Sequence, residues 1–373
     1  MRRIYLDANA TTPLDPRVRE AMEPYLDCGN ASSLHAEGRA ARDAVEMARD
    51  RVAALVGASR REIVFTSGGT EANALALLGA IAASGRGPVL GSAVEHPSVQ
   101  NTLDGLRPAV DVRTVPVDGA GRVDPETAIP EGAVLMSVML ANNETGAIQP
   151  VAALAGRARQ AGVVFHCDAV QACGKIPVDV SELDVDLLSL SAHKMHGPKG
   201  AGALFVRRGT RVQPLYRGGE HERGLRPGTE NVAALVGLGA AAELAAAELE
   251  ERVASWGRLT GLLLGRLRRE VPGSVVQSHE PRVANTLNLR FPGAEGEAVL
   301  LGLDLEGIAV STGSACSSGA PEASHVLRAM GLTQVEAEES IRVSLHAGST
   351  ENDVNGLVNA LSRVVKNLRA LHV

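Results

Sequence analysis

Three short stretches of the sequence place polar side chains directly after apolar runs that are typical of buried strands. The first is SLSAHKMHGPKG (residues 189–200), in which Ser191, His193 and Lys194 follow an apolar run and precede a turn. A lysine at the carboxyl end of a strand in an open α/β sheet points into the crevice where such sheets bind ligands. Taken alone, the stretch favours the simpler interpretation of a surface lysine in a turn.

The second stretch is FTSGGTEAN, where an apolar run passes through Gly68 and Gly69 into a helical pattern that begins at Thr70. Small residues let the backbone close on an oxyanion, and the amides of the first helical turn donate to it. The stretch therefore predicts a phosphate cradle, although an ordinary helix cap explains the same residues.

The third stretch is FHCDAVQA, in which Asp168 ends an apolar run and Gln171 follows it. A carboxylate buried there needs a partner, and the protonated nitrogen of a pyridine ring would be one. The alternative is that Asp168 caps a helix. Together, the lysine, the cradle and the carboxylate indicate pyridoxal 5'-phosphate, which Lys194 would hold as a Schiff base.

A fourth stretch, STGSACSSGAP (residues 311–321), surrounds Cys316 with small residues that favour an adaptable loop. Its own neighbours leave open whether this thiol is a nucleophile or only a small residue in a loop.

The elements that must position these residues follow from periodicity. Alternating strand and helix patterns between residues 60 and 210 predict an α/β fold with one mainly parallel, seven-stranded sheet. The expected strands are 62–66, 88–92, 112–117, 133–140, 163–168, 186–191 and 202–207, and two of the crossover helices are 70–84 and 151–162.

The carboxyl-terminal third predicts a smaller α+β domain. One long helical pattern runs from Ala240 to Arg269, and the stretches 285–291 and 341–347 alternate with period two. In the second of these strands, alternation places Arg342 on the face opposite the apolar residues, where it is presented rather than buried with the core. We expect a large domain at 15–250 and a small domain made of 1–14 and 251–373.

Composition excludes several function classes. The chain has 373 residues and a formal net charge of -6, which disfavours direct binding of nucleic acid. We expect no signal peptide, no membrane segment and a cytoplasmic location with reduced thiols. Aromatic residues are only 2% of the chain, so histidine is the obvious substitute as a stacking partner for a flat ligand.

The sequence resembles the cysteine desulfurases, pyridoxal-phosphate enzymes of the aminotransferase class V type, and is most similar to their nitrogen-fixation and iron-sulfur-cluster assembly branch. The motifs that carry this resemblance span nearly the whole chain in order: YLDANATTP, GNASSLHAEG, FTSGGTEAN, EHPSV, ANNETGAIQP, HCDAVQACGK, SAHKMHGPKGAGALFVRRGT, RGGEHERGLRPGTEN and STGSACSSGAPEASHVLRAMG. It implies fold type I, an L-cysteine substrate and a homodimer with shared sites.

The resemblance also implies a role for individual residues. Lys194 matches the Schiff-base lysine, and Cys316 matches the thiol that receives sulfur as a persulfide. The matches to cofactor ligands are Gly69, Thr70, His96 (stacked on the ring and a proton carrier), Asn143, Asp168, Gln171, Ser191, His193 and Thr229, the last toward the neighbouring subunit. Asn30, Asn143 and Arg342 match the residues that bind the substrate.

Two segments depart from the family pattern. The amino-terminal motif reads DANA, and the segment after Arg342 reads SLHAGSTEND. Both put the shape of the substrate pocket in doubt, but not the cofactor.

The expected activity converts L-cysteine to L-alanine and passes sulfur through Cys316 to an acceptor or scaffold protein, for iron-sulfur clusters, thiolated transfer RNA or another product. The alternatives are a selenocysteine lyase, an aminotransferase on the same scaffold and a non-catalytic sulfur carrier. No metal site is expected, because the remaining cysteines and histidines lack ligand spacing: Cys28, Cys167, Cys173, His166, His196 and His221.

Overall fold

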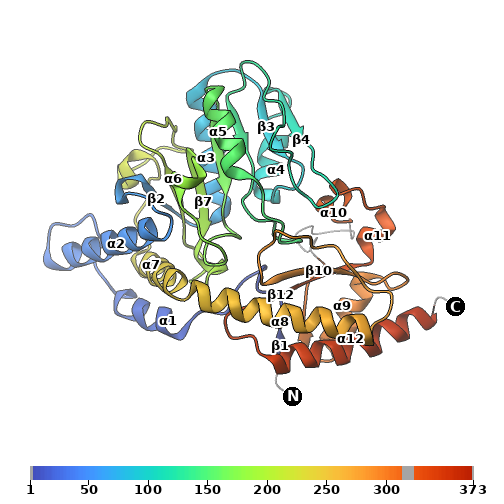
Figure 1. Cartoon of the computed structure of the whole chain (residues 1–373). Helices are drawn as coiled ribbons and strands as arrows, with labels where there is room; N and C mark the ends of the chain where they lie inside the picture. The colour runs from blue at the N-terminus through green and yellow to red at the C-terminus, as the bar shows by residue number, and fades with distance from the viewer. Residues whose placement is uncertain (1–2, 313–322, 372–373) are drawn as a thin grey trace.

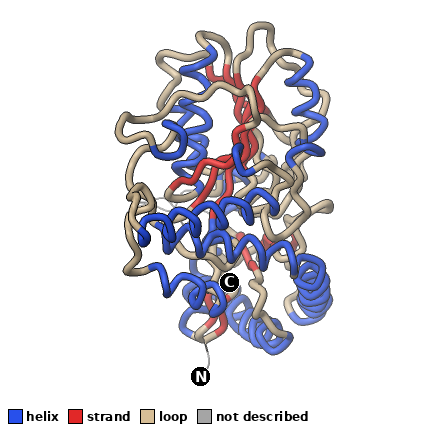
Figure 2. Tube along the Cα trace, turned by 90° about the vertical axis from the view of Figure 1, so that its left-hand side faces the viewer, coloured by secondary structure: helices blue, strands red, loops and turns tan. Residues whose placement is uncertain are grey.

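The protein folds around a large open sheet that is covered by helices on both faces, with a second, smaller layer of strands and long helices below it (Figure 1). This computed structural model describes residues 3–312 and 323–371. Turned by a quarter, the strands of the large sheet lie between two helical layers (Figure 2). This arrangement is the α/β class that the sequence predicts.

Helices and strands alternate along most of the chain. The large sheet and its helices comprise α1 (Pro16–Met22), α2 (Ala36–Leu55), β2 (Ile63–Thr66), α3 (Gly69–Ser84), β3 (Val89–Ser92), α4 (Pro97–Asp104), β4 (Val112–Val115), β5 (Leu135–Ser137), α5 (Val151–Gln160), β6 (Val164–Asp168), α6 (Val180–Leu183), β7 (Leu187–Ser191), β8 (Gly202–Val206) and α7 (Val232–Ala247). The smaller part comprises β1 (Ile4–Tyr5), α8 (Leu249–Glu270), β9 (Val275–Val276), β10 (Thr286–Arg290), α9 (Gly296–Leu305), β11 (Ile308–Ala309), α10 (His325–Ala329), α11 (Gln334–Glu338), β12 (Ser340–Ser344) and α12 (Glu351–Leu371). Short 3-10 turns are η1 (Glu23–Tyr25), η2 (Arg60–Glu62), η3 (Ala192–Lys194) and η4 (His221–Gly224).

The seven predicted strands all form, and they join in the order β2-β8-β7-β6-β5-β3-β4. β8 runs antiparallel to both of its neighbours, and every other pair in the sheet is parallel. The strand expected at 133–140 is shorter and ends at Ser137 as β5. The carboxyl ends of β3, β5, β6 and β7 consequently lie along one edge, where open sheets bind ligands.

The large sheet is buried on both faces because its strands are apolar at consecutive positions. In β2, for example, Ile63 and Phe65 belong to the core shared with α2, α5 and α7, whereas Val64 belongs to the core shared with α3 and α4. Uninterrupted apolar strands of this kind are typical of a parallel sheet covered by helices on both sides.

The smaller part has its own core. Leu6 near the amino terminus packs there with Trp256 of α8 and with residues of β10, β12 and α12. In β12, Ile341 and Val343 face this core, so the predicted alternation is confirmed. The domain boundaries at 14/15 and 250/251 stay a prediction.

The long helix expected from Ala240 to Arg269 is wrong in one respect. Two helices, α7 and α8, meet at Glu248 with a bend of 69°. The α7 helix is apolar on almost every side and lies in the large core, whereas α8 is amphipathic and covers the small core. The apolar pattern of the sequence continues through the bend, because both helices bury apolar residues. The α7 helix buries them in the large core and α8 buries them in the small core.

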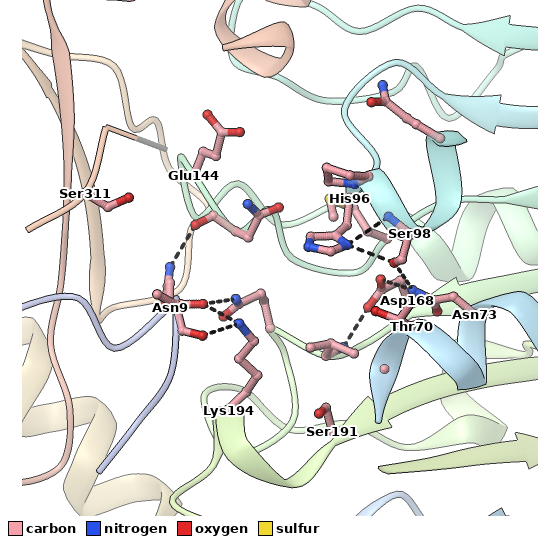
Figure 3. A pocket seen from close by; sticks show the side chains of 18 of the residues that line it. Asn9, Thr70, Asn73, His96, Ser98, Glu144, Asp168, Ser191, Lys194 and Ser311 are labelled. Carbon is pink, nitrogen blue, oxygen red and sulfur yellow. Dashed lines mark hydrogen bonds between the residues drawn. The ribbon is translucent and has the colours of Figure 1, made fainter. Parts of the chain in front are cut away.

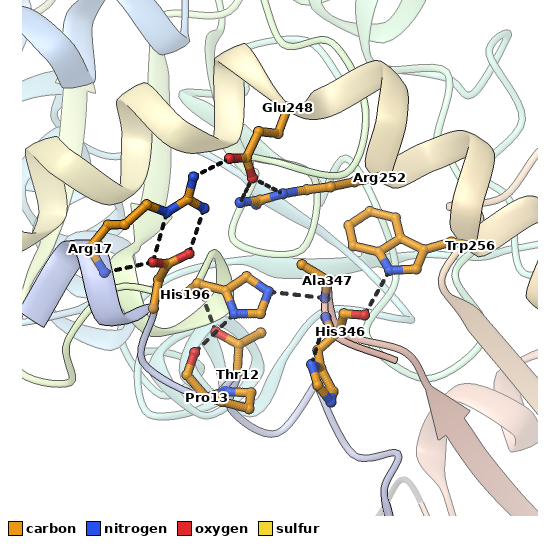
Figure 4. A network of polar contacts seen from close by, with 11 residues as sticks. Thr12, Pro13, Arg17, His196, Glu248, Arg252, Trp256, His346 and Ala347 are labelled. Carbon is orange, nitrogen blue, oxygen red and sulfur yellow. Dashed lines mark hydrogen bonds and ion pairs between the residues drawn. The ribbon is translucent and has the colours of Figure 1, made fainter. Parts of the chain in front are cut away.

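Polar contacts hold the two parts together below the large sheet (Figure 4). His196, two residues after Lys194, donates through Nδ1 to the carbonyl of Pro13 at 2.9 Å and accepts from Ala347 N–H through Nε2 at 3.3 Å. Trp256 Nε1 donates to the carbonyl of His346 at 3.1 Å. These bonds fix the end of the small sheet against the turn that carries Lys194.

Within the described ranges, no single helix combines the length and apolar composition needed to cross a membrane. The bent pair α7 and α8, taken together, does pass that test of length and composition.

A fully buried carboxyl, Glu95, ties the ends of β3 and β5 together. One carboxyl oxygen of Glu95 accepts from Ser92 Oγ at 2.5 Å and from Met139 N–H at 2.8 Å. The backbone carbonyl of Glu95 accepts from His325 Nε2 at 2.9 Å. Its second oxygen has no hydrogen-bond partner in the part of the chain that the structure describes. Burial raises the pKa of Glu95 to about 8, and the nearby Asp168 adds to the shift.

Glu95 makes stability depend on pH in a definite direction. The unfolded chain releases this proton near pH 4.5, whereas the folded protein holds it until about pH 8, so rising pH destabilises the fold across this window. We expect Glu95→Gln to gain up to about 4 kcal/mol of unfolding free energy relative to the unmodified protein between these two pH values. Denaturant unfolding at pH 5 and 8 measures the change.

The exposed carboxyl variant Glu131→Gln serves as the control for loss of one carboxyl group. A difference between Glu95→Gln and the unmodified protein that stays constant from pH 5 to 8 would contradict the assignment of a neutral Glu95.

Candidate active site

A cavity of about 710 Å³ opens at the carboxyl edge of the large sheet, where the small part meets it. Its walls come from segments far apart in the chain, including Asn9, Asp168, Lys194 and Arg342. Figure 3 shows Asn9, Glu144 and Ser311 on one side of it and Thr70, Asn73 and Asp168 on the other. The volume suits a small-molecule cofactor together with a substrate.

One end of the cavity is built to hold an anion. Gly69 and Thr70 begin α3, and the first amides of a helix have no partners within the helix. A side chain at Gly69 would come within 2.8 Å of Val170, so glycine lets the helix start pack closely over the strand ends. Ser191 and His193 line the same wall. This end therefore matches the predicted phosphate cradle.

Asp168 ends β6 and is almost fully buried. Its Oδ1 accepts from Val170 N–H at 2.9 Å, and its Oδ2 accepts from Asn73 Nδ2 at 2.7 Å. The carboxylate therefore holds the turn that follows β6, whereas the simpler interpretation expected it to cap a helix, and no helix begins at this point of the described chain. Asp168 also lines the cavity, as expected if it is a cofactor ligand.

A chain of hydrogen bonds links Asp168 to His96. The second hydrogen of Asn73 Nδ2 points to Ser98 Oγ at 2.9 Å, and this hydroxyl lies 2.8 Å from His96 Nδ1. His96 Nδ1 also accepts from Ser98 N–H at 3.1 Å, and burial lowers the pKa of the imidazole. With Nδ1 as the acceptor, the neutral ring carries its proton on Nε2.

Lys194 approaches from the opposite side, in the 3-10 turn η3 after β7. Its Nζ donates to the backbone carbonyls of Asn9 at 2.6 Å and of Ala10 at 2.9 Å. The amino-terminal segment thus holds the amine at the cavity wall. The positive charge of Lys194 also helps burial to lower the pKa of His193 to about 4.

Arg342 closes the far end of the cavity from the small sheet. We expected it to be presented rather than buried with the core, and its side chain does line the cavity on the face opposite Ile341 and Val343, although only 5% of it is exposed to solvent. It donates to Asp7 Oδ1 at 2.7 Å and to the carbonyl of Asn143 at 3.1 Å. Asp7 and Asn143 therefore fix the plane of the guanidinium group.

Three buried polar atoms of the cavity residues have no hydrogen-bond partner among the described residues: Ser191 Oγ, Asn73 Oδ1 and Arg342 Nε. Leaving such an atom unpaired costs about 1–3 kcal/mol. A ligand with a phosphate at the Ser191 end and a carboxylate at the Arg342 end would pair two of them. The donor set therefore fits pyridoxal phosphate with an amino-acid substrate.

Two predicted site residues lie elsewhere in this chain. Asn30 is exposed and accepts from Ser32 N–H, and Thr229 is exposed after η4; neither lines the cavity. Their segments meet each other, since Ser32 Oγ lies 3.2 Å from His221 Nε2. Cys316 lies in 313–322, outside the described residues, but Ser311 and Ala323 on either side of that segment both line the cavity.

The remaining predicted ligands are in the cavity wall. Gln171 and Asn143 both line it, and Gln171 Nε2 donates to the carbonyl of Asn9 at 3.0 Å. By contrast, Cys167 and Cys173 are buried in the large core, where burial raises both thiol pKa values, that of Cys173 to about 12. Within residues 3–312 and 323–371, no group of three or more His, Cys, Asp or Glu side chains could hold a metal ion.

Sequence reasoning missed several residues that organise the cavity. Asn9 was noted only as part of a departure from a motif, and Asn73, Ser98 and Lys175 were not singled out. Asn73 left a usable signal, because it is a polar residue inside an otherwise apolar helical pattern. The part played by Asn9 depends on tertiary contacts that no local pattern reports.

The comparisons with known proteins agree with this geometry. The family model for aminotransferase class-V matches residues 4–357. A cysteine desulfurase IscS of Dictyoglomus turgidum is 44% identical over 379 residues, covering 99% of this chain and 96% of that protein.

Solved structures give the same result. A NifS-like protein superposes with a TM-score of 0.92 at 36% identity, covering 98% of this chain and all of the other. SspA in complex with cysteine superposes with a TM-score of 0.82 at 32% identity, covering 92% and 99% of the two chains. The chain therefore belongs to the aminotransferase class-V family and, within it, to the cysteine desulfurases.

Proposed function

We propose that this protein is a pyridoxal-phosphate-dependent cysteine desulfurase that converts L-cysteine to L-alanine and takes the sulfur onto Cys316. The observation that carries the proposal is the placement of Lys194 and Asp168 on facing walls of one cavity, with an anion cradle at one end and Arg342 at the other. The cysteine desulfurases similar to this chain, and the neighbour SspA with bound cysteine, support the substrate.

The residues of the cavity divide the cofactor and substrate between them. Asp168 would pair with the ring nitrogen, Gln171 and Asn143 with the ring oxygen, and Gly69, Thr70, Ser191 and His193 with the phosphate. When bound, pyridoxal phosphate supplies an electron sink that stabilises negative charge at the α-carbon of an amino acid. Arg342 would bind the substrate carboxylate through one terminal nitrogen and through Nε, which has no hydrogen-bond partner among residues 3–312 and 323–371, in a bidentate contact.

Protons are moved by two side chains on opposite walls. The amine of Lys194 reaches the cavity from the side opposite Asp168. We assign to this amine the removal and return of the proton on the α-carbon of the substrate. His96 is neutral and protonated on Nε2, and it would lie against the ring of the bound cofactor and exchange a proton at that atom. Ser98 and Asn73 hold the imidazole in this tautomer.

The sulfur step uses the thiol of Cys316. Its thiolate attacks the sulfur of the substrate, so an S–S bond forms while the C–S bond breaks and its electron pair stays on carbon. A proton on that carbon completes alanine, and the protein keeps a persulfide. An acceptor or scaffold protein then receives the sulfur.

We also propose a homodimer in the cytoplasm. The segments that carry Asn30 and Thr229 meet on the surface away from the cavity of their own chain, which supports a role for them toward a second copy.

The first test follows sulfur by mass. Protein loaded with pyridoxal phosphate and incubated with L-cysteine should gain one sulfur atom and release alanine without any added keto acid. Cys316→Ala should gain none while still binding the cofactor, because the thiol acts only on the substrate. Intact-mass spectrometry and alanine quantification measure both.

Cys28→Ala is the matched control, since Cys28 is a partly exposed thiol outside the cavity, and it should behave as the unmodified protein. Alanine formation that needs a keto acid would indicate an aminotransferase instead. Turnover of selenocysteine alone would indicate a lyase.

The second test addresses substrate binding. Arg342→Lys removes the planar fork that holds the carboxylate, so KM for L-cysteine should rise at least about tenfold while the absorption of the bound cofactor stays unchanged. Arg290→Lys, on the neighbouring strand and paired with Glu336 and Glu339, is the control. An unchanged KM in Arg342→Lys would contradict the carboxylate role.

A further inference from the structure

A second lysine, Lys175, is buried directly behind the cavity. Only 3% of its surface is exposed, and it does not line the cavity. Its Nζ donates to Asn9 Oδ1 at 2.7 Å and to Gln171 Oε1. Among residues 3–312 and 323–371, no carboxylate lies within ion-pair distance of this amine.

Lys175 is buried and no described carboxylate pairs with it. Burying its amine therefore costs free energy that packing alone would not require. Desolvation lowers its pKa well below the usual range, and the charges of Lys194 and Arg342 lower it further. A neutral amine has two N–H donors, which match the two oxygens in contact with it. An apolar side chain of the same length would fill the space at lower cost, so the amine has another role.

Lysine is rare in this chain. Only four of its 37 basic residues are lysines, Lys175, Lys194, Lys199 and Lys366. Two of the four converge on Asn9, one on its side-chain oxygen and the other on its backbone carbonyl. Lysine can lose its proton when buried, whereas arginine cannot.

Two contacts select the direction in which the amide of Gln171 points. Lys175 Nζ donates to Gln171 Oε1, and the carbonyl of Asn9, which can only accept, requires Gln171 Nε2 on its side. The Nε2 group is thereby turned the other way, where it donates to the carbonyl of Asn9 at 3.0 Å and keeps a second hydrogen. Without Lys175, the carbonyl of Asn9 would be the one remaining contact, among those the structure describes, that selects this orientation.

The same amine contacts Asn9. Lys175 Nζ and Asn285 Nδ2 donate to Asn9 Oδ1 at 2.7 and 3.4 Å, and Asn9 Nδ2 donates to the carbonyl of Asn143 at 3.0 Å and to Thr286 Oγ1 at 2.9 Å. The carbonyl of Asn143 in turn accepts from Arg342. One buried amine therefore donates to the side-chain oxygens of two amides in the cavity wall.

We propose that Lys175 is a positioning residue for the cofactor: together with the carbonyl of Asn9, it holds the amide of Gln171 with its N–H group turned toward the cavity. This inference rests on the proposed function, because it concerns how the chain receives pyridoxal phosphate. Lys175 itself does not touch the cofactor or the substrate.

The test is a double-mutant cycle that reads cofactor binding rather than turnover. Protein freed of cofactor is titrated with pyridoxal phosphate, and the affinity and the visible absorption of the complex are recorded. Lys175→Met should weaken binding about five- to tenfold and shift the absorption band, because Gln171 loses one of the two contacts that orient its amide. In the Gln171→Leu background, Lys175→Met should change the affinity less than about twofold.

A purely structural role for Lys175 would give the same loss in both backgrounds, and that result would overturn the inference. Lys366→Met, which removes an exposed lysine on α12, is the control for loss of one amine. Melting temperatures of the cofactor-free proteins are measured in parallel. If Lys175→Met does not fold, Lys175→Gln, which can still donate to one of the two oxygens, is carried through the same cycle.

The cycle also separates this inference from the proposed function. Normal binding by the unmodified protein together with additive losses overturns only the role of Lys175. Absence of any pyridoxal phosphate binding by the unmodified protein overturns both.

Discussion

The site depends on one residue of the amino-terminal segment, Asn9, which is buried where the two parts of the protein meet. Its backbone carbonyl accepts from Lys194 and Gln171, and its side chain accepts from Lys175 and donates toward Asn143. These groups come from three segments, because Gln171 and Lys175 share the stretch after β6. A backbone carbonyl is neutral and does not titrate. It therefore holds the amine of Lys194 in place without stabilising the charged form of that amine as strongly as a carboxylate would.

The two parts of the chain contribute different chemistry because they fold around different cores. The large parallel sheet gathers the ends of β6 and β7 at one edge, and this brings Asp168 and Lys194 into one cavity. The small sheet adds Arg342, whose apolar neighbours on β12 face the opposite side. The contacts of His196 and Trp256 hold the two parts together, so the fold sets the distance between the Ser191 end and the Arg342 end of the cavity.

Much of this arrangement could be predicted from the sequence, for physical reasons. Residues at the ends of buried strands must meet at one edge, so Asp168 and Lys194 were identifiable from local patterns. Asn9 and Lys175 were not, because their roles come from contacts between segments more than 160 residues apart. The break between α7 and α8 was missed because the apolar pattern runs through Glu248 although the helices serve different cores.

The arrangement of the cavity assigns the cofactor to Lys194 and not to the neighbouring Lys175. The most direct measurement is borohydride reduction of the protein loaded with pyridoxal phosphate, followed by mass mapping of its peptides. The account predicts a pyridoxyl group on Lys194 and an unmodified Lys175, since only Lys194 lines the cavity. A pyridoxyl group on Lys175, or on neither lysine, would contradict it.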